Sequence, residues 1–135
     1  ELHGRLRDLY CTACADRPAG VDFDTLCLPP RCARCGGVLR PDVVLFGERL
    51  PAASVARYDR ELASGFDMMF AVGTTAGFPY IHEPVVAATR RGTITVEINP
   101  GETPLSRLVT HRLQCSARAA LHALGEHLGL SVGGA

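Results

Sequence analysis

Two Cys-x-x-Cys pairs constrain this chain more than any other feature of its sequence. They occur as Cys-Thr-Ala-Cys and Cys-Ala-Arg-Cys-Gly-Gly and comprise Cys11, Cys14, Cys32 and Cys35. Each pair presents two thiolates from one tight turn, so the two turns together supply the four sulfur ligands of a tetrahedral Zn²⁺ site. Four protein ligands leave no position for water, and the pattern therefore predicts a structural metal rather than a catalytic one.

Two disulfides, or a redox-active pair, are the alternatives to zinc. The chain opens with no secretory signal, and thioredoxin-type chemistry uses a single Cys-x-x-Cys motif, so the spacing favours zinc over both. Two further cysteines lie outside the pairs. Cys27, between the pairs, is expected to be a buried apolar residue, and Cys115 receives no role from its spacing.

Composition narrows the class of protein. The chain has 135 residues, 47% of them hydrophobic, which suffices for one core and a small appendage. No apolar run approaches the roughly 20 residues of a membrane helix. The formal net charge is zero, whereas phosphate binding normally leaves a clustered basic excess. We expect no membrane and no direct nucleic acid partner.

The source of the chain is also indicated by its composition. Every basic residue is Arg and none is Lys, which is typical of a GC-rich genome, and free thiolates for metal fit a reducing bacterial cytoplasm. We therefore expect a cytoplasmic protein. The sequence does not begin with Met, and we interpret it as a piece of a longer protein.

The apolar content and the periodicity of the sequence change after Pro41. Residues 6–41 contain little helical periodicity and few apolar residues, so they are predicted to form a zinc-binding module whose folding depends on the metal. In residues 42–135, apolar runs predict strands over 43–46, 67–72, 93–98 and 111–115. Helical spacing predicts helices over 52–64 and 82–91, the second closed by Gly92. Ser116 is expected to cap a last helix with a stripe of Leu121, Leu124 and Leu128, before a loose tail at 131–135.

Regular alternation of strands and helices predicts an α/β fold, with part of a Rossmann-like parallel sheet and the zinc-ribbon module inserted beside it. Ligands of such sheets lie at the carboxyl ends of strands, which directs attention to Gly73-Thr74-Thr75, to Asn99 and to the Phe-Gly-Glu that ends at Glu48. Taken alone these are weak signals. The fingerprint Gly-x-Gly-x-x-Gly is absent, and Asn99 before a proline is also a common turn former.

Taken together, the motifs of this chain occur in an order that resembles that of a known protein family. Glu-Leu-His-Gly opens the chain, the two cysteine pairs follow, and then come Leu-Arg-Pro-Asp-Val-Val-Leu-Phe-Gly-Glu, Val-Gly-Thr-Thr and Glu-Ile-Asn-Pro. This order resembles the sirtuin family of NAD-dependent protein-lysine deacylases, from Glu1 to about Leu128. The resemblance implies that acyl groups are removed from protein lysine in a transferase reaction that yields nicotinamide and O-acyl-ADP-ribose.

The resemblance also implies roles for residues near the amino end. His3 matches the family's catalytic base, a task that suits histidine because it exchanges protons near neutral pH. Val44 and Phe46 match the apolar walls around the acyl-lysine, which has lost its charge and is easily buried. Gly47 and Glu48 match positions beside the substrate backbone, where the peptide adds as a strand.

The second half of the chain is implied to bind NAD, the co-substrate. Gly73, Thr74, Thr75 and Asn99 match family contacts to NAD, and the stretch around Cys115 matches the loop near adenine. Cys11, Cys14, Cys32 and Cys35 match the structural zinc ligands. We expect acylated lysine of protein substrates to be the partner of the complete protein.

Two departures from the family pattern affect these expectations. After Thr75 the proline comes one place early, so Phe78 either narrows the acyl channel or lies elsewhere. The family's Gly-Ala-Gly loop, Asp-Phe-Arg segment and Gln-Asn-x-Asp motif, which lie upstream of Leu-His-Gly, do not occur here. We therefore expect these 135 residues alone to be inactive. The alternatives are a non-catalytic NAD or ADP-ribose binding domain and a zinc-ribbon interaction module. Acyl-chain preference, protein substrates and oligomeric state are not determined by the sequence.

Overall fold

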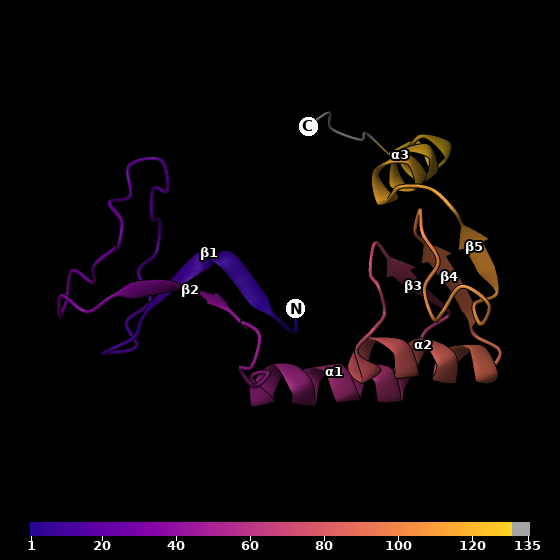
Figure 1. Ribbon diagram of the computed structural model, residues 1–135, viewed down its shortest axis with the longest axis horizontal. Coiled ribbons are helices and arrows are strands. Elements are labelled where there is room, and N and C mark those ends of the chain that lie inside the picture. Colours follow the sequence, from indigo (N-terminus) through magenta and orange to yellow (C-terminus); the bar gives the residue numbers. More distant parts are fainter. Residues whose placement is uncertain (131–135) are drawn as a thin grey trace. The chain divides into compact units, whose positions relative to one another are not determined.

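A computed structural model describes residues 1–130, and the expected tail at 131–135 lies outside the described residues. The chain divides into two compact units, Glu1–Ala63 and Ser64–Ala135 (Figure 1). The change in apolar content and periodicity after Pro41, where we predicted a domain boundary, falls inside strand β2 (Leu39–Val43). Each unit has its own sheet.

The first unit contains a two-stranded antiparallel ribbon and one helix. β1 (Gly4–Cys11) pairs with β2 in a register that places Gly4 opposite Val43 and Cys11 opposite Leu39, with an irregularity between Arg5 and Leu9. Helix α1 (Ala52–Ser64) follows where helical spacing predicted it. We did not predict β1, because its first five residues are all exposed and show no apolar alternation.

The predicted buried strand at 43–46 is wrong. The strand β2 ends at Val43, pairs antiparallel with β1 and belongs to the two-stranded ribbon rather than to the parallel sheet. Leu45 and Phe46 lie outside any strand and are 55% and 97% exposed. The apolar run indicated burial, but the backbone after Val44 turns back on itself, since the Glu48 amide donates to the Leu45 carbonyl at 3.0 Å.

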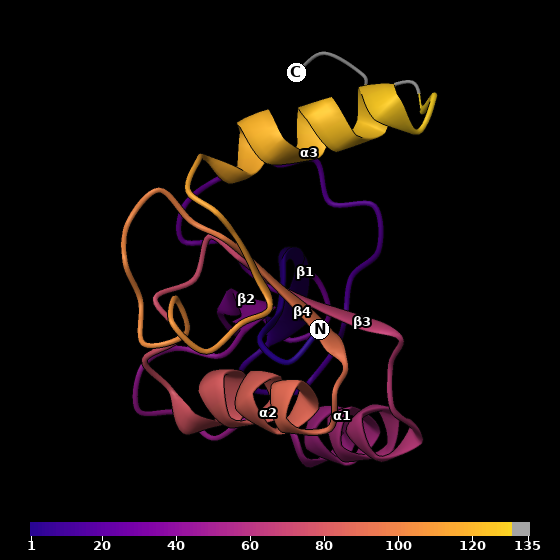
Figure 2. The ribbon, with the colours of Figure 1, turned by 90° about the vertical axis from the view of Figure 1, so that its right-hand side faces the viewer.

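The second unit is the predicted parallel sheet. β3 (Met68–Val72), β4 (Ile94–Ile98) and β5 (His111–Leu113) are all parallel, in the order β3-β4-β5. Helices α2 (Pro79–Arg90) and α3 (Ala117–His127) lie on opposite faces of this sheet, as Figure 2 shows. This Rossmann-like arrangement confirms the predicted fold class.

The two faces of the sheet form separate cores because side chains alternate along each strand. Under α2, Ala71 packs with Val85 and with Leu105 from the loop after β4. Under α3, Val96 and Ile98 pack against Ala120. The other buried position of this helix is Gly125, which has no side chain to add to the contact. The α3 face is therefore held by a smaller apolar contact than the α2 face.

The helix ends confirm part of the prediction and correct part of it. Helix α2 begins at Pro79, three residues earlier than we predicted, because proline is well accommodated in the first helical turn. Gly92 follows this helix with φ +82°, and the Ser116 hydroxyl accepts from the Ala119 amide at 3.2 Å, as predicted for a C-terminal glycine and an N-cap.

The predicted leucine stripe of the last helix does not face the core. Leu121, Leu124 and Leu128 are 49%, 38% and 66% exposed, and the buried positions of α3 are Ala120 and Gly125. Small residues let the helix approach the sheet closely, so the leucines are left outside. Among the described residues, no helix has both the length and the apolar character that crossing a bilayer requires.

Candidate functional site

The four cysteines of the two pairs converge in the first unit. Their sulfur atoms all lie within 4.8 Å of one another. The Sγ–Sγ distances are 3.4 Å for Cys11 and Cys35, 3.8 Å for Cys14 and Cys32, and 3.3 Å for Cys35 and Cys14. A tetrahedron with zinc–sulfur bonds of about 2.3 Å has edges of about 3.8 Å, whereas a disulfide requires about 2.05 Å. The cluster therefore fits a four-sulfur structural zinc ion and not a disulfide.

Glycines explain how the second turn reaches the cluster. Gly36 has φ +73°, and its amide donates to the Cys32 carbonyl at 2.8 Å. A Cβ on Gly37 would lie 2.8 Å from the Ala13 Cβ and 3.0 Å from the Cys11 sulfur. The Gly-Gly that follows the second pair thus serves two needs, a left-handed turn and a close approach to sulfur.

The electrostatics of the cluster favour a bound cation. The backbone amides of Cys14 and Ala13 lower the pKa of the Cys11 thiol to about 6. The pKa of the Cys14 thiol is raised to about 12, although the Asp16 amide acts to lower it, because burial and the neighbouring sulfurs disfavour a second thiolate. A divalent cation removes that conflict, since zinc binds thiolates and stabilises them.

The fifth cysteine of this unit is not where we expected it. Cys27 is exposed rather than buried, and its neighbour Leu28 is 85% exposed. Val21 and Leu26 of the loop between the two cysteine turns pack against the core of the module, whereas Cys27 and Leu28 stay exposed. The apolar core of this module consists of Leu9 and Leu39 with two of the metal-ligating cysteines, Cys11 and Cys32.

His3 and the predicted substrate segment are brought together in the first unit. The Val44 amide donates to the His3 carbonyl at 3.0 Å, which continues the β1–β2 pairing beyond Gly4 and Val43. Gly4 has φ +76°, and a Cβ at this position would lie 1.9 Å from the Asp42 carbonyl oxygen. The glycine of the Leu-His-Gly motif is therefore required for the strands to meet beside His3.

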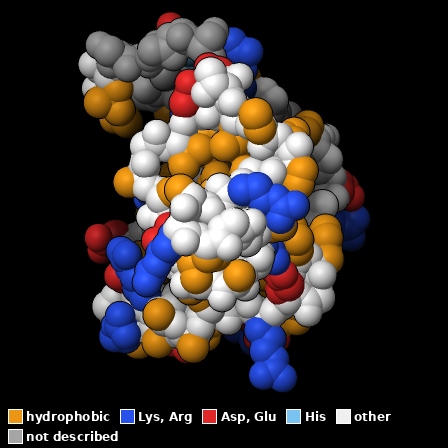
Figure 3. All heavy atoms as spheres, turned by 90° about the vertical axis from the view of Figure 1, so that its left-hand side faces the viewer, with side chains coloured by type: hydrophobic (Ala, Val, Ile, Leu, Met, Phe, Trp, Pro, Cys, Tyr) orange, Lys and Arg blue, Asp and Glu red, His pale blue; other side chains and the backbone are white. Residues whose placement is uncertain are grey.

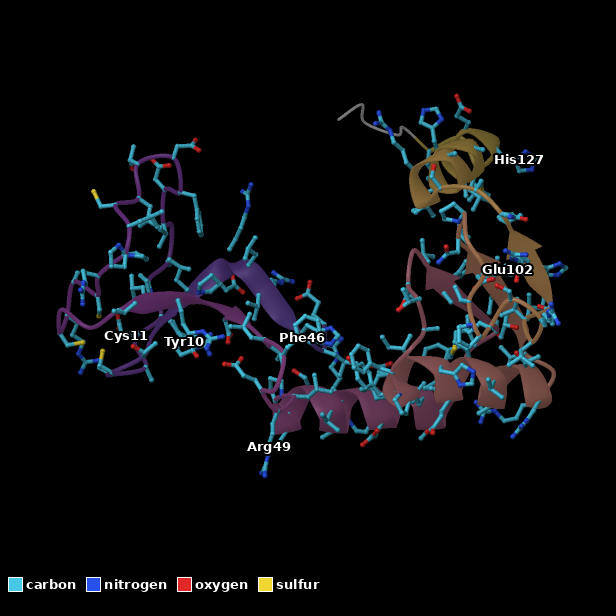
Figure 4. The ribbon with its side chains drawn as sticks, viewed as in Figure 1. Tyr10, Cys11, Phe46, Arg49, Glu102 and His127 are labelled. Atoms are coloured by element: carbon cyan, nitrogen blue, oxygen red, sulfur yellow. The ribbon has the colours of Figure 1, made fainter. Side chains whose placement is uncertain are left out.

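The segment after Val44 presents a large apolar side chain. Figure 4 places Phe46 between the ribbon and α1, and its side chain is 97% exposed. Gly47 follows with φ +85° and closes the turn. The Glu48 carboxylate is held by Arg40 and by the Leu45 amide. The first unit thus carries His3, Val44, Phe46, Gly47 and Glu48 within a few residues of one strand end.

The predicted NAD-contacting residues also meet, in the second unit. The Asn99 side-chain amide donates to the Thr74 carbonyl at 2.9 Å, and the Gly73 amide donates to the Ile98 carbonyl at 2.9 Å. These groups follow the carboxyl ends of β3 and β4, where parallel sheets bind ligands. Thr75 is exposed in the same loop, so the predicted positions 73–75 and 99 form one edge of the sheet.

Cys115 lies after the next strand. The Asn99 amide donates to the Leu113 carbonyl at 3.1 Å, which brings the segment after β5 to the same edge, and Cys115 is half-buried there against the α3 core. It also lines an apolar pocket of about 380 Å³ with Leu113, Ala120 and Leu124.

A buried carboxylate behind this edge escaped sequence analysis. Glu97 is 1% exposed and accepts hydrogen bonds from the Thr103 hydroxyl and, at 2.7 Å, from the Ser106 hydroxyl. Its carboxylate also lies 3.4 Å from the Arg112 guanidinium. These contacts fasten the loop that starts at Asn99. Glu97 belongs to the Glu-Ile-Asn-Pro motif of the sequence. Its burial could not be predicted, because no local pattern shows that a glutamate in a strand is buried.

The chain matches the Sir2 family model over residues 1–78. It is 52% identical over 110 residues to "NAD-dependent protein deacylase 2" of Pseudomonas aeruginosa, a match that covers 81% of this chain and 43% of the relative. It is 43% identical over 129 residues to a protein of the same name from Pseudomonas syringae pv. tomato, over 95% of this chain and 52% of the relative. The chain belongs to the Sir2 family, the sirtuins, as the motifs implied.

Solved structures agree with this assignment. A Sir2 homologue in complex with NAD superposes with a TM-score of 0.75 at 33% identity, covering 96% of this chain and 50% of that one. A Sir2 bound to the inhibitor EX-527, 2'-O-acetyl-ADP-ribose and a deacetylated p53 peptide gives a TM-score of 0.77 at 27% identity, over 97% and 56%. The chain thus spans about half the length of the relatives that it matches.

Proposed function

We propose that the complete protein containing this chain removes acyl groups from protein lysine side chains, consuming NAD and yielding nicotinamide and O-acyl-ADP-ribose. The relatives from both Pseudomonas species are named NAD-dependent protein deacylases. The observation that carries the proposal is the hydrogen bond from the Val44 amide to the His3 carbonyl. It holds a candidate proton acceptor beside an exposed apolar segment suited to an acyl-lysine.

The first unit would supply the base and the substrate walls. In the proposed reaction the acyl oxygen bonds to the ribose carbon as nicotinamide leaves, and the His3 imidazole takes the proton of a ribose hydroxyl. Val44 is half-buried and Phe46 nearly fully exposed. At 97%, Phe46 is the most exposed of the large apolar residues in the described part of the chain, and its ring is available for contact with a neutral acyl chain.

The second unit would bind NAD at the carboxyl edge of β3 and β4. Nothing lies within 4 Å of the place where a Cβ on Gly73 would stand, so the backbone there is open to a ligand. Thr74 and Asn99 hold the two strand-end loops together through their hydrogen bond. Open backbone and hydroxyl groups at this edge suit ribose and phosphate.

A substitution at His3 tests the proposal. With NAD and an acylated peptide, His3→Tyr in the complete protein should lower nicotinamide release by roughly 10²- to 10⁴-fold, the usual contribution of a general base, while zinc content is unchanged. His127→Tyr, at the exposed end of α3, is the matched control and should retain activity. The chain contains no lysine, so acyl-lysine signals cannot arise from it.

Retained turnover in His3→Tyr would contradict the assignment of the base. Binding of NAD without turnover by the native protein would instead favour the non-catalytic alternative. The 135 residues alone should show no nicotinamide release, because they span about half the length of the relatives that are named NAD-dependent protein deacylases. Robust turnover by this chain would contradict that expectation.

We further propose a cytoplasmic location, with acylated protein as the partner and no direct contact with nucleic acid or membrane. On the face shown in Figure 3, arginine side chains stand apart among apolar and uncharged atoms instead of forming one basic patch. Formal net charge is zero over the whole chain. Both observations support a partner recognised by shape and backbone rather than by phosphate charge.

A further inference from the structure

Arg40 on β2 makes an unusually complete set of contacts with the segment that follows this strand. Its two terminal nitrogens donate to the two carboxylate oxygens of Glu48, at 2.7 and 3.1 Å. One of the same nitrogens also donates to the Val43 carbonyl at 2.9 Å. This is a fork-to-fork ion pair with an added backbone contact, the geometry that gives arginine its directional strength.

Glu48 uses its carboxylate inside the protein. One oxygen accepts from the Leu45 amide at 2.9 Å, while the Glu48 amide donates back to the Leu45 carbonyl at 3.0 Å. The turn from Leu45 to Glu48 is therefore closed from both ends. The hydrogen bond from Arg40, with the Leu45 amide second, lowers the pKa of the Glu48 carboxyl to about 2, so the carboxylate is ionised at neutral pH.

Arg40 is in turn held against β1. Its guanidinium carbon lies 5.6 Å from the centre of the Tyr10 ring, and the guanidinium carbon of Arg17 lies at the same distance from that ring. Arg17 also donates to the Asp42 carboxylate at 2.6 Å. The pair therefore stands on a braced part of the β1–β2 ribbon, and Figure 4 shows Tyr10 within that ribbon.

We infer that Arg40 and Glu48 are positioning residues for the acyl-lysine segment: their side chains bind each other and the Val43 and Leu45 backbone, and so set the path of Val44 to Gly47. The inference rests on the proposed function. Phe46 is 97% exposed and has little packing to orient it, so the closed turn determines where its ring lies. The pair joins the strand to the turn that follows it, so what it fixes locally is the path of the backbone from Val43 to Glu48.

The test is steady-state kinetics of the complete protein with the acylated peptide varied. Arg40→Met should raise the peptide KM and lower kcat/KM by roughly 10- to 100-fold, the loss expected when a binding segment shifts by about 1 Å. The KM for NAD and the zinc content should stay within about twofold, because the changed contacts lie in neither site.

Conservative variants separate geometry from charge. Arg40→Lys keeps the positive charge but loses the fork, and should retain only part of the peptide affinity. Glu48→Gln keeps an acceptor for the Leu45 amide and should lose less than Arg40→Met. Because the two residues act as one unit, Arg40→Met/Glu48→Gln should be no worse than Arg40→Met alone.

A matched control lies on α1. Arg57 and Glu61 form another exposed Arg–Glu pair, at 3.7 Å, away from the turn. Arg57→Met removes a comparable charge pair and should leave the peptide KM unchanged. An equal rise in KM for Arg57→Met, additive losses in the double variant, or an unchanged peptide KM in Arg40→Met would each overturn the inference.

A second measurement keeps this test separate from the proposed activity. Exchange of the Leu45 amide hydrogen should become faster in Arg40→Met and stay unchanged in Arg57→Met. Faster exchange with normal peptide KM would show a merely structural pair and overturn the inference. If the native protein has no deacylase activity, the proposed function fails, and binding of acylated against unmodified peptide to native and Arg40→Met protein then decides the inference.

Discussion

Each of the two units of this chain is stabilised internally, and the interactions that stabilise them differ. In the first, two of the four residues of the apolar core, Cys11 and Cys32, are also metal ligands, and ion pairs brace the ribbon. In the second, two apolar clusters cover the two faces of a parallel sheet. The folded structure near His3 therefore depends on a metal and on the geometry of ion pairs, whereas the structure near Asn99 depends on buried apolar contacts.

Loss of the metal should have the largest effect on the difference between the two units, because it should unfold only the first. A structural zinc site contributes about 10–16 kcal/mol of apparent binding free energy, and the first unit has little other core. Cys32→Ser should therefore abolish zinc binding and the amide signals of β1 and β2, while amide protection in β3 and β4 persists. Native mass spectrometry and hydrogen exchange measure the two effects. Cys27→Ser, at an exposed cysteine, is the control; loss of zinc there would refute the four-ligand assignment.

Removal of the buried carboxylate should produce the reverse pattern. Glu97→Ala removes the carboxylate that the Thr103 and Ser106 hydroxyls share and one of the partners of Arg112, at a cost of about 3 kcal/mol of unfolding free energy. Zinc content should stay normal. Urea unfolding followed by signals of the second unit gives the measurement. Glu83→Ala, exposed on α2, should change stability by less than about 0.5 kcal/mol, and a similar loss there would show that Glu97 has no special role.

A methyl group beside the sulfur atoms should have a moderate effect. Gly37→Ala places a Cβ 2.8 Å from Ala13 and 3.0 Å from the Cys11 sulfur, so the turn must shift, at a cost of about 1–3 kcal/mol. Competition with a zinc chelator should show weaker metal binding. Gly101→Ala, whose Cβ would meet nothing closer than 3.7 Å, belongs to the second unit and should leave zinc affinity unaltered. Equal zinc affinity in both variants would remove this explanation of the Gly-Gly motif.

The smallest expected effect concerns pH. Arg40 and the Leu45 amide lower the pKa of the Glu48 carboxyl from 4.5 to about 2. A lowered carboxyl pKa adds stability that is fully present above the ordinary value and is lost as the pH falls through the lowered one. The Glu48 carboxyl ¹³C signal should therefore hold its ionised position from pH 7 to pH 4. It should move over that range in Arg40→Met, and movement in the native protein would contradict the pairing.

The predicted site residues differ in how local their signals were. The four cysteines were predicted from spacing, since a Cys-x-x-Cys turn is complete within four residues. Strand ends directed attention to Gly73 and Asn99, because parallel strands deliver their carboxyl ends to one edge, and the family resemblance then implied their contact with NAD. Arg40 was missed: it reaches Glu48 across eight positions through a turn whose shape no periodicity reveals.

The errors share a physical cause. The apolar run at 43–46 and Cys27 were assigned to the interior, and the leucines of α3 to one stripe of the helix, because apolar residues are usually buried. In the structure Phe46, Leu128 and Cys27 are exposed. Apolar character fixes a preference for burial, but only packing decides which apolar groups find a partner within these residues.

By itself, the sequence determined the features set by short-range chemistry: the thiolate pairs and their metal, the alternation of strands and helices, and the ordered motifs of the Sir2 family. Tertiary structure alone decided which strands pair, that Gly4 must lie against the Asp42 carbonyl beside His3, and that Arg40 closes the Phe46 turn. The reason is that ligand spacing and periodicity are local properties of a chain, whereas register, burial and charge pairing join residues that only the folded backbone brings into contact.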